Sequence, residues 1–241
     1  MEQVAVIIAF YNGNKYIKEL INSIFNQTFK NFHIFIFDDN SPFPFDIDSL
    51  ELSLKNKNKI TFTRRKKNLG FTMNFLYALN AIEKKFDFYS FCDQDDIWMT
   101  DKLERAIARI KKENVNQPLI YGTKTLHVDH TGKNIIGESI NISKELSFKN
   151  ALIQPFAGGN TMVFNNKAKD LLVSSLKNIS PAAHDWWSYL IITGNGGKAL
   201  YDSKFSLFYR QHSENKMGSN KTFSGKFKRF LRVLFLVPMM T

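Results

Sequence analysis

The chain has 241 residues, of which 44 % are hydrophobic, so it can bury the core of one large domain. Its 33 basic and 22 acidic residues give a formal net charge of +11, which favours a polyanionic partner: nucleic acid, anionic lipid or a phosphorylated substrate. The single cysteine, Cys92, excludes an internal disulfide, and no apolar run is long enough to span a bilayer. The first residues lack the pattern of a secretory signal, so we expect a cytoplasmic protein.

The first half of the chain alternates short apolar runs with segments of helical periodicity. Strands are predicted at residues 4–10, 32–37, 60–63 and 86–91. Helices are predicted at residues 16–25, 71–81 and 101–112. This alternation predicts an α/β domain whose mainly parallel sheet carries helices on both faces.

The second half has a less regular pattern. Strands are predicted at residues 119–128, 160–164, 196–201 and 205–210, and helices at 167–176 and 185–192. One domain is expected to end near residue 215, because no repeat or low-complexity linker interrupts it. In the tail, 216–241, apolar residues recur at helical spacing among lysines and arginines, which predicts a short basic amphipathic helix. That helix would lie either on a membrane surface or on the protein's own body.

Carboxylates follow two of the predicted strands. Asp38 and Asp39 end one strand, and the run 93–96 with sequence Asp-Gln-Asp-Asp ends another. Ligands of an open parallel sheet bind at the carboxyl ends of its strands, and Mg²⁺ or Mn²⁺ prefers oxygen ligands. Alternation along a strand would turn Asp93 and Asp95 toward one ligand and Gln94 away from it. The alternative is a solvated acidic turn that caps the next helix.

Three further clusters are candidates for binding or catalysis. Tyr11 follows the first strand and could hold a nucleobase together with Asp39, unless its ring only packs. Asp185 stands between His184 and two tryptophans, which suggests a general base beside an aromatic wall; the alternative is a helix N-cap. The run 210–212, Arg-Gln-His, offers a metal ligand in its histidine and a phosphate contact in its arginine, although a lone histidine is more often non-catalytic.

Several motifs, in their order along the chain, resemble glycosyltransferase family 2. The block at 91–98 and the later motifs resemble its rhamnosyltransferase-like branch, and the resemblance covers about residues 3–213. The motifs are Ala9-Phe10-Tyr11-Asn12, Ser23-Ile24-Phe25-Asn26-Gln27-Thr28, Asp38-Asp39-Asn40-Ser41, Asn68-Leu69-Gly70, Phe91-Cys92-Asp93-Gln94-Asp95-Asp96-Ile97-Trp98, His184-Asp185-Trp186-Trp187 and Tyr209-Arg210-Gln211-His212.

The resemblance implies a GT-A fold, with a nucleotide-sugar-binding half at 1–98 and an acceptor-binding half at 99–215. It implies an inverting sugar transfer from a nucleotide-diphosphate sugar to a glycan or lipid-linked acceptor in bacterial surface polysaccharide biosynthesis. Asp185 would be the catalytic base, and Mn²⁺ or Mg²⁺ would be bound by Asp93, Asp95 and His212. The donor would be contacted by Phe10, Tyr11, Asp38, Asp39, Asn68, Asp93, Gln94 and Arg210.

The sequence departs from the family pattern after the second strand. Asn40 stands where the family often has glycine, and asparagine tolerates the left-handed backbone that this turn needs. The run 42–44, Pro-Phe-Pro, is unusual and puts the shape of that loop in doubt. Because the acceptors of this family are often lipid-linked, we expect a peripheral protein at the inner face of the cell membrane, held through residues 222–241.

Two other functions compete with sugar transfer. A nucleotidyltransferase also uses metal-binding aspartates, but it usually needs a glycine-rich or basic phosphate loop, and the loop after the first strand has one glycine, Gly13. A nucleic-acid-binding module would suit the charge, but it leaves the strand-end aspartates unexplained. Apart from the run 64–67 and the tail, Lys and Arg are dispersed, so no nucleic-acid partner is expected.

Overall fold

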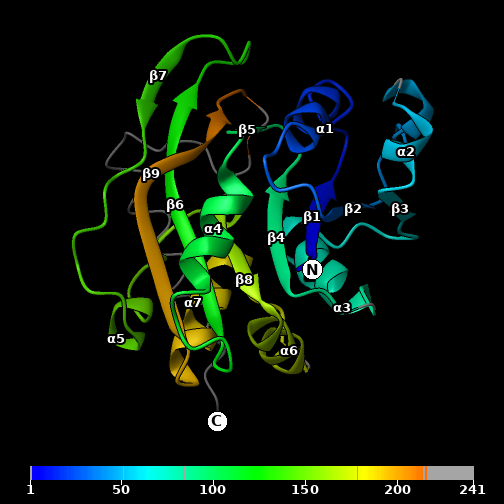
Figure 1. The fold of residues 1–241 in the computed structure, drawn as a ribbon. Helices are drawn as coiled ribbons and strands as arrows, with labels where there is room; N and C mark the ends of the chain where they lie inside the picture. The colour runs from blue at the N-terminus through cyan, green and yellow to red at the C-terminus, as the bar shows by residue number, and fades with distance from the viewer. Residues whose placement is uncertain (1, 51, 84, 178, 214, 216–241) are drawn as a thin grey trace.

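A computed structural model describes residues 2–215 except 51, 84, 178 and 214. Its centre is one mixed sheet with strand order β3-β2-β1-β4-β8-β6-β9-β5, and β7 pairs with β6 off this path (Figure 1). The strands are β1 (Val4–Phe10), β2 (Phe32–Asp38), β3 (Ile60–Arg64), β4 (Phe88–Asp93), β5 (Ile97–Trp98), β6 (Leu119–Val128), β7 (Ile135–Glu138), β8 (Val163–Asn165) and β9 (Lys198–Arg210).

Helices cover both faces of this sheet, as the alternation of elements predicted (Figure 1). The α-helices are α1 (Ile17–Phe25), α2 (Leu54–Lys57), α3 (Phe71–Ala81), α4 (Lys102–Ile110), α5 (Phe148–Ala151), α6 (Asn166–Ser174) and α7 (His184–Gly194). Two 3₁₀ turns, η1 (Ile47–Leu50) and η2 (Gly159–Thr161), complete the described elements.

Strands β3, β2, β1 and β4 are parallel to one another, as the alternation of strands and helices predicted. All seven residues of β1 are buried, which explains why this strand is a continuous apolar run. In the register of the sheet, Phe10 pairs with Asp38 and Ala9 pairs with Asp93. The acidic residues of β2 and β4 therefore lie on either side of the end of β1, at the same edge of the sheet.

The second half of the sheet is mixed. Strand β8 runs antiparallel to β4 and β6, whereas β6 and β9 are parallel. The two strands predicted at 196–201 and 205–210 are one strand, β9, whose register against β6 shifts near Thr123 and Lys124. The strand predicted at 160–164 begins instead as η2, and only β8 is extended there. The sequence pattern missed β5, β7, α2, α5 and η1, each of which spans only two to four residues.

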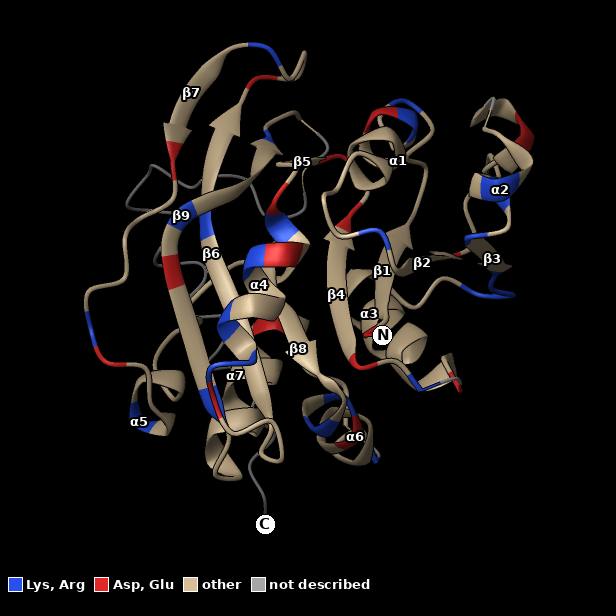
Figure 2. Ribbon diagram, in the orientation of Figure 1, with Lys and Arg blue, Asp and Glu red and all other residues tan. Residues whose placement is uncertain are grey.

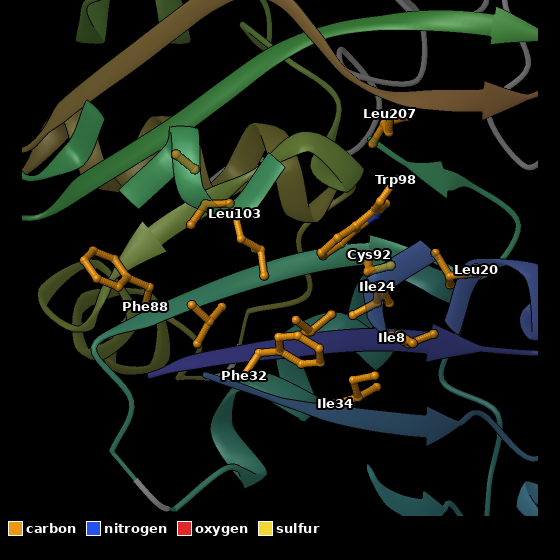
Figure 3. Packing of buried hydrophobic residues seen from close by; sticks show 14 of the residues in the cluster. Ile8, Leu20, Ile24, Phe32, Ile34, Phe88, Cys92, Trp98, Leu103 and Leu207 are labelled. Atoms are coloured by element: carbon orange, nitrogen blue, oxygen red, sulfur yellow. The ribbon is translucent and has the colours of Figure 1, made fainter. Parts of the chain in front are cut away.

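Two hydrophobic clusters lie on opposite faces of the sheet. The first joins α1 and α4 to β1, β2 and β4, and Figure 3 shows Leu20, Ile24 and Leu103 packed over Ile8 and Cys92. The second lies under α3, α6 and α7. Cys92 is fully buried, and burial raises the pKa of its thiol well above the usual value.

Positive backbone φ angles mark the loops at the carboxyl edge. Asn12 follows β1 with φ 52°, and Asn40 follows β2 with φ 63°. The Asn40 value confirms that asparagine replaces glycine in a left-handed turn. Gly70, with φ 83°, precedes α3 and allows the chain to enter this helix.

The predicted amphipathic tail, 216–241, lies outside the described residues, so that prediction stays a prediction. The same holds for the domain boundary near residue 215 and for the division into halves at residue 98. In the part of the chain that the structure describes, no helix is long and apolar enough to cross a bilayer.

Candidate active site

The acidic turn, defined as residues 93–96, follows β4 and sends its side chains in different directions. Asp93 is partly exposed, and one of its carboxylate oxygens, Oδ1, is buried without a hydrogen-bond partner. Asp95 Oδ2 lies 2.7 Å from His212 Nε2. Asp96 is fully buried, and its Oδ2 accepts a hydrogen bond of 2.7 Å from the Asn160 amide. The turn therefore holds one partly exposed carboxylate, Asp93, and two buried ones, Asp95 beside His212 and Asp96 beside Asn160.

Negative charge accumulates at the acidic turn. Burial, and then the neighbouring charges of Asp95 and Asp185, raise the pKa of Asp93 well above its usual value. Burial, with the charges of Asp93 and Asp95, has the same effect on the pKa of Asp96. The charge of Asp185 thus contributes to the raised pKa of Asp93. A divalent cation would relieve this repulsion, because opposite charge stabilises the ionised carboxylates.

The residues predicted to hold a metal come together in part. Asp95 and His212 are 117 positions apart in sequence and form a 2.7 Å contact, and the His212 ring packs on Tyr16 with centroids 4.8 Å apart. Among the described residues, no group of three or more His, Cys, Asp or Glu side chains forms a complete cation site. A cation that is held by one or two carboxylates and by substrate phosphates needs no such group.

Gln94 holds the loop after β1. Its Oε1 accepts a hydrogen bond from the Tyr11 N–H at 2.8 Å, and its Nε2 donates to the Tyr11 carbonyl at 3.0 Å. A Cβ on Gly13 would come within 2.3 Å of Gln94 Oε1, so a glycine there leaves room for this amide. Gln94 therefore positions Tyr11 with both polar atoms of its side chain. The Tyr11 side chain is left 43 % exposed.

The aspartates after β2 organise two loops. Asp38 is fully buried, and its Oδ1 accepts hydrogen bonds from the N–H and hydroxyl of Ser41. This carboxylate lies inside its own turn, and the prediction that Asp38 contacts the donor stays a prediction. Asp39 accepts hydrogen bonds of 2.8 Å from the backbone N–H groups of Leu69 and Gly70. It thereby joins the second strand to the loop that begins at the exposed Asn68.

Two more of the predicted donor contacts have buried side chains. Phe10 is fully buried and packs against Phe45 with ring centroids 5.5 Å apart, so its side chain belongs to the core. Arg210 is 1 % exposed, and its guanidinium donates to the carbonyls of Asp95 and His130 and to the carboxylate of Glu19. It therefore ties the acidic turn to α1, and the donor contacts predicted for both residues stay predictions.

Helix α7 delivers Asp185 to the site. The N-cap of this helix is Ala183, so the alternative that Asp185 caps the helix is wrong. Asp185 Oδ1 accepts the N–H of Trp186 at 2.7 Å. The indole N–H of Trp186 donates to the Ala151 carbonyl, and that of Trp187 donates to Ser175. Both tryptophans thus brace the helix, whereas an aromatic wall for a sugar ring remains a prediction.

His184, beside Asp185, is buried among aromatic rings. Its ring stacks on Phe75 at 4.3 Å and meets Phe71 and Phe91 edge-on. Burial lowers the pKa of His184 to about 4, so the imidazole is neutral near neutral pH. A Cβ on Gly159 would lie 2.1 Å from His184 Nε2, so this histidine fits only against a glycine. This packing fixes the start of α7, and therefore Asp185, against β4 and α3.

Sequence reasoning missed Lys102 and Asn160, which lie beneath the acidic turn. Lys102 is 1 % exposed and donates to the Asn160 carbonyl at 2.9 Å. A signal was available in the sequence, because Lys102 precedes Ala106 by four positions and therefore shares the apolar face of the predicted helix.

Known proteins resemble this chain in sequence and in fold. The sequence model of glycosyl transferase family 2 matches residues 5–172. The dTDP-rhamnosyl transferase RfbG of Shigella flexneri is 26 % identical over 229 residues, which cover 92 % of this chain and 77 % of RfbG. A second relative is the UDP-Glc:alpha-D-GlcNAc-diphosphoundecaprenol beta-1,3-glucosyltransferase WfgD of Escherichia coli. It is 29 % identical over 146 residues, which cover 59 % of this chain and 54 % of WfgD.

Among solved structures, S. aureus TarS 1–349 in complex with UDP-GlcNAc superposes with a TM-score of 0.67 at 21 % identity. The match covers 97 % of this chain and 65 % of that one, so the chain spans less than two thirds of WfgD and of this TarS fragment. The likeness to TarS confirms the predicted GT-A fold, and the family match covers well over half of the sequence. The chain belongs to glycosyltransferase family 2.

Proposed function

We propose that this protein is an inverting glycosyltransferase of bacterial surface polysaccharide biosynthesis. It would move a sugar from a nucleotide-diphosphate sugar to a hydroxyl group of a glycan or lipid-linked acceptor. The observation that carries the proposal is the acidic turn after β4 at the carboxyl edge of the sheet, where Asp95 Oδ2 lies 2.7 Å from His212 Nε2. The names of RfbG and WfgD, and the UDP-GlcNAc bound to TarS, support this class of donor and acceptor.

The carboxylates of Asp93 and Asp95 suit a divalent cation. Asp93 has a buried oxygen without a hydrogen-bond partner, and Asp95 lies beside His212, whose Nε2 faces the carboxylate. Mn²⁺ or Mg²⁺ accepts such oxygen and imidazole ligands and completes its shell with substrate phosphates. When bound, the cation would stabilise the negative charge that develops on the leaving diphosphate. Asp93, Asp95 and His212 would hold it in place.

Asp185 would be the general base of the transfer. One oxygen accepts the Trp186 N–H, which fixes the carboxylate and leaves the other oxygen for the acceptor. The acceptor oxygen would form a bond to the anomeric carbon, and the bond from that carbon to the diphosphate would break. The acceptor proton would pass to Asp185. A single displacement of this kind inverts the anomeric centre and needs no covalent nucleophile.

The nucleotide base would lie between the loops after β1 and β2. The Tyr11 ring is 43 % exposed and is held by Gln94 through its backbone, so it can stack on a base. Asp39 already accepts two backbone N–H groups, but a carboxylate has about four lone-pair sites and can accept a base N–H as well. The exposed Asn68 borders the same loop.

No observation favours the two competing functions. Figure 2 shows Lys and Arg spread over α2, α4, α5 and α6, mixed with Asp and Glu, and not gathered on one nucleic-acid-binding face. The loop between β1 and α1 contains one glycine, Gly13. It is therefore not the glycine-rich phosphate loop of a nucleotidyltransferase.

A donor screen by thermal shift tests the proposal. UDP, dTDP, GDP and CMP are each added with Mn²⁺ or with EDTA. We expect one nucleoside diphosphate to stabilise the protein with Mn²⁺ by about 2.7 kcal/mol at 100 times its Kd. For a chain of this length that corresponds to an increase in Tm of about 5–10 °C. The shift should largely disappear in EDTA, because the cation joins the diphosphate to the acidic turn.

The same screen can contradict the proposal. If no nucleotide changes Tm more with Mn²⁺ than with EDTA, the metal-bridged donor site is wrong. A shift produced by an oligonucleotide but by no nucleoside diphosphate would support the nucleic-acid-binding alternative.

Attachment to the inner face of the cell membrane belongs to the same proposal, because an acceptor linked to a lipid stays at that surface. The basic and apolar residues of 222–241 would provide the contact. We expect the full chain to float with vesicles that contain anionic lipid, and a chain ending at residue 221 to stay in the dense fraction. Equal flotation of both forms would exclude residues 222–241 as the anchor.

A further inference from the structure

Lys102 is a buried lysine on the apolar face of α4. It is 1 % exposed, and the same face buries Leu103, Ala106, Ile107 and Ile110. Its ammonium donates to the Asn160 carbonyl at 2.9 Å and lies 4.7 Å from the centre of the Trp98 ring. A lysine so placed costs several kcal/mol in lost hydration, whereas a leucine or methionine would continue the apolar face at no such cost. Packing alone therefore does not explain it.

The surroundings of Lys102 explain why a charged residue is buried there. Asn160 accepts from Lys102 with its carbonyl and donates 2.7 Å to Asp96 with its side chain, so it links the ammonium to the acidic turn. The other buried cation near this turn, Arg210, is already paired with Glu19. Lys102 thus supplies unshared positive charge beneath a group of carboxylates.

We propose that Lys102 is a counter-charge that positions the acidic turn and makes the capture of a divalent cation depend on the nucleotide diphosphate. The inference rests on the proposed function, because it concerns the same donor site. It adds a residue that touches neither the donor nor the cation and acts through Asn160 and through its charge.

The sign of the effect follows from Coulomb's law. A fixed positive charge beneath the turn repels a free cation and attracts a free diphosphate. Lys102 therefore weakens the binding of Mn²⁺ alone and strengthens the binding of a nucleoside diphosphate alone. When both ligands are bound their charges partly cancel, so the two favour each other's binding. Such a site takes up metal and nucleotide together and does not hold the metal in advance.

Two neutral variants separate the charge of Lys102 from its hydrogen bond. Lys102→Gln keeps an N–H donor for the Asn160 carbonyl, whereas Lys102→Met keeps only the length of the side chain. Mn²⁺ binding is followed by electron paramagnetic resonance without nucleotide. Binding of UDP or dTDP, whichever stabilises the wild type, is followed by calorimetry in EDTA. Both variants should bind Mn²⁺ about fivefold more tightly and the nucleotide about fivefold more weakly, about 1 kcal/mol each.

The control removes a charge from the opposite end of the same helix. Lys111, the C-cap of α4, forms a surface ion pair with Glu2, and Lys111→Gln should change neither affinity. If both ligands bind more weakly to the Lys102 variants, or if both affinities stay unchanged, Lys102 is only structural and the inference is wrong. If the wild type binds neither UDP nor dTDP in the presence of Mn²⁺, the proposed function itself is contradicted.

Discussion

Replacement of Asp95 by asparagine is expected to abolish the dependence of nucleotide binding on metal and to lower turnover at least 10³-fold. Asparagine keeps the size of the side chain and an oxygen that faces His212, but it removes the charge that a divalent cation requires. Loss of the cation removes several kcal/mol of stabilisation from the leaving diphosphate, and each 1.36 kcal/mol is tenfold in rate. Turnover is measured as release of nucleoside diphosphate, and binding as the difference in Tm between Mn²⁺ and EDTA.

A matched surface aspartate gives the control for this variant. The side chain of Asp48 is 78 % exposed and pairs with Lys57 on the surface, so Asp48→Asn should keep both the Mn²⁺-dependent shift and the turnover. If Asp95→Asn keeps the Mn²⁺-dependent shift of the wild type, Asp95 is not a metal ligand. The 2.7 Å contact with His212 would then be a structural ion pair.

The place of the site could be predicted because its strands are buried. Strand β1 has no exposed residue, so it appears in the sequence as an unbroken apolar run with a clear end. The same is true of β4, and the residues that follow such runs lie at the carboxyl edge whatever the details of the fold. The sequence therefore placed Asp39, Asp93 and Asp95 in one region without any knowledge of side-chain contacts.

The roles of individual side chains could not be predicted in this way. Arg210 is the last residue of β9 and looks like a phosphate ligand, but its partners come from α1, from the acidic turn and from the loop before β7. Those partners lie 80 to 191 positions away in sequence, so no local pattern shows them. The burial of Phe10 and Asp38 could not be predicted for the same reason, because tertiary packing decides which side of a strand end is covered.

Short elements were missed for a different reason. Strand β5 has two residues and pairs with β9 more than 100 positions later, so its extended shape depends on the partner strand and not on its own sequence. The register of β6 against β9 shifts near Lys124. The polar stretch at 202–204 interrupts the apolar pattern of β9, so one long strand looks like two in the sequence. Lys102 shows the opposite case: a charge on an apolar helix face is visible in the sequence and marks a functional requirement.

Replacement of Asp185 by asparagine is expected to lower kcat by about 10²–10⁴ and to leave nucleotide binding intact. Positioned general bases contribute rate factors of this size, and asparagine cannot accept the acceptor proton. Donor affinity should not fall, because Asp185 raises the pKa of Asp93 by repulsion and its neutral replacement removes that repulsion. The measurement is kcat from nucleotide release, together with the Kd of the nucleoside diphosphate with Mn²⁺.

The opposite behaviour of the two aspartate variants separates the two halves of the mechanism. Asp95→Asn should lose metal-dependent binding, whereas Asp185→Asn should bind normally and turn over slowly, because a base acts only as the acceptor attacks. Asp170, an exposed aspartate of α6, provides the control, and Asp170→Asn should match the wild type in both quantities. If Asp185→Asn keeps kcat within about threefold of the wild type, far less than a positioned base contributes, another group accepts the proton. Asp93 would then be the nearest carboxylate to test, because its unpartnered oxygen belongs to the same cluster of charges.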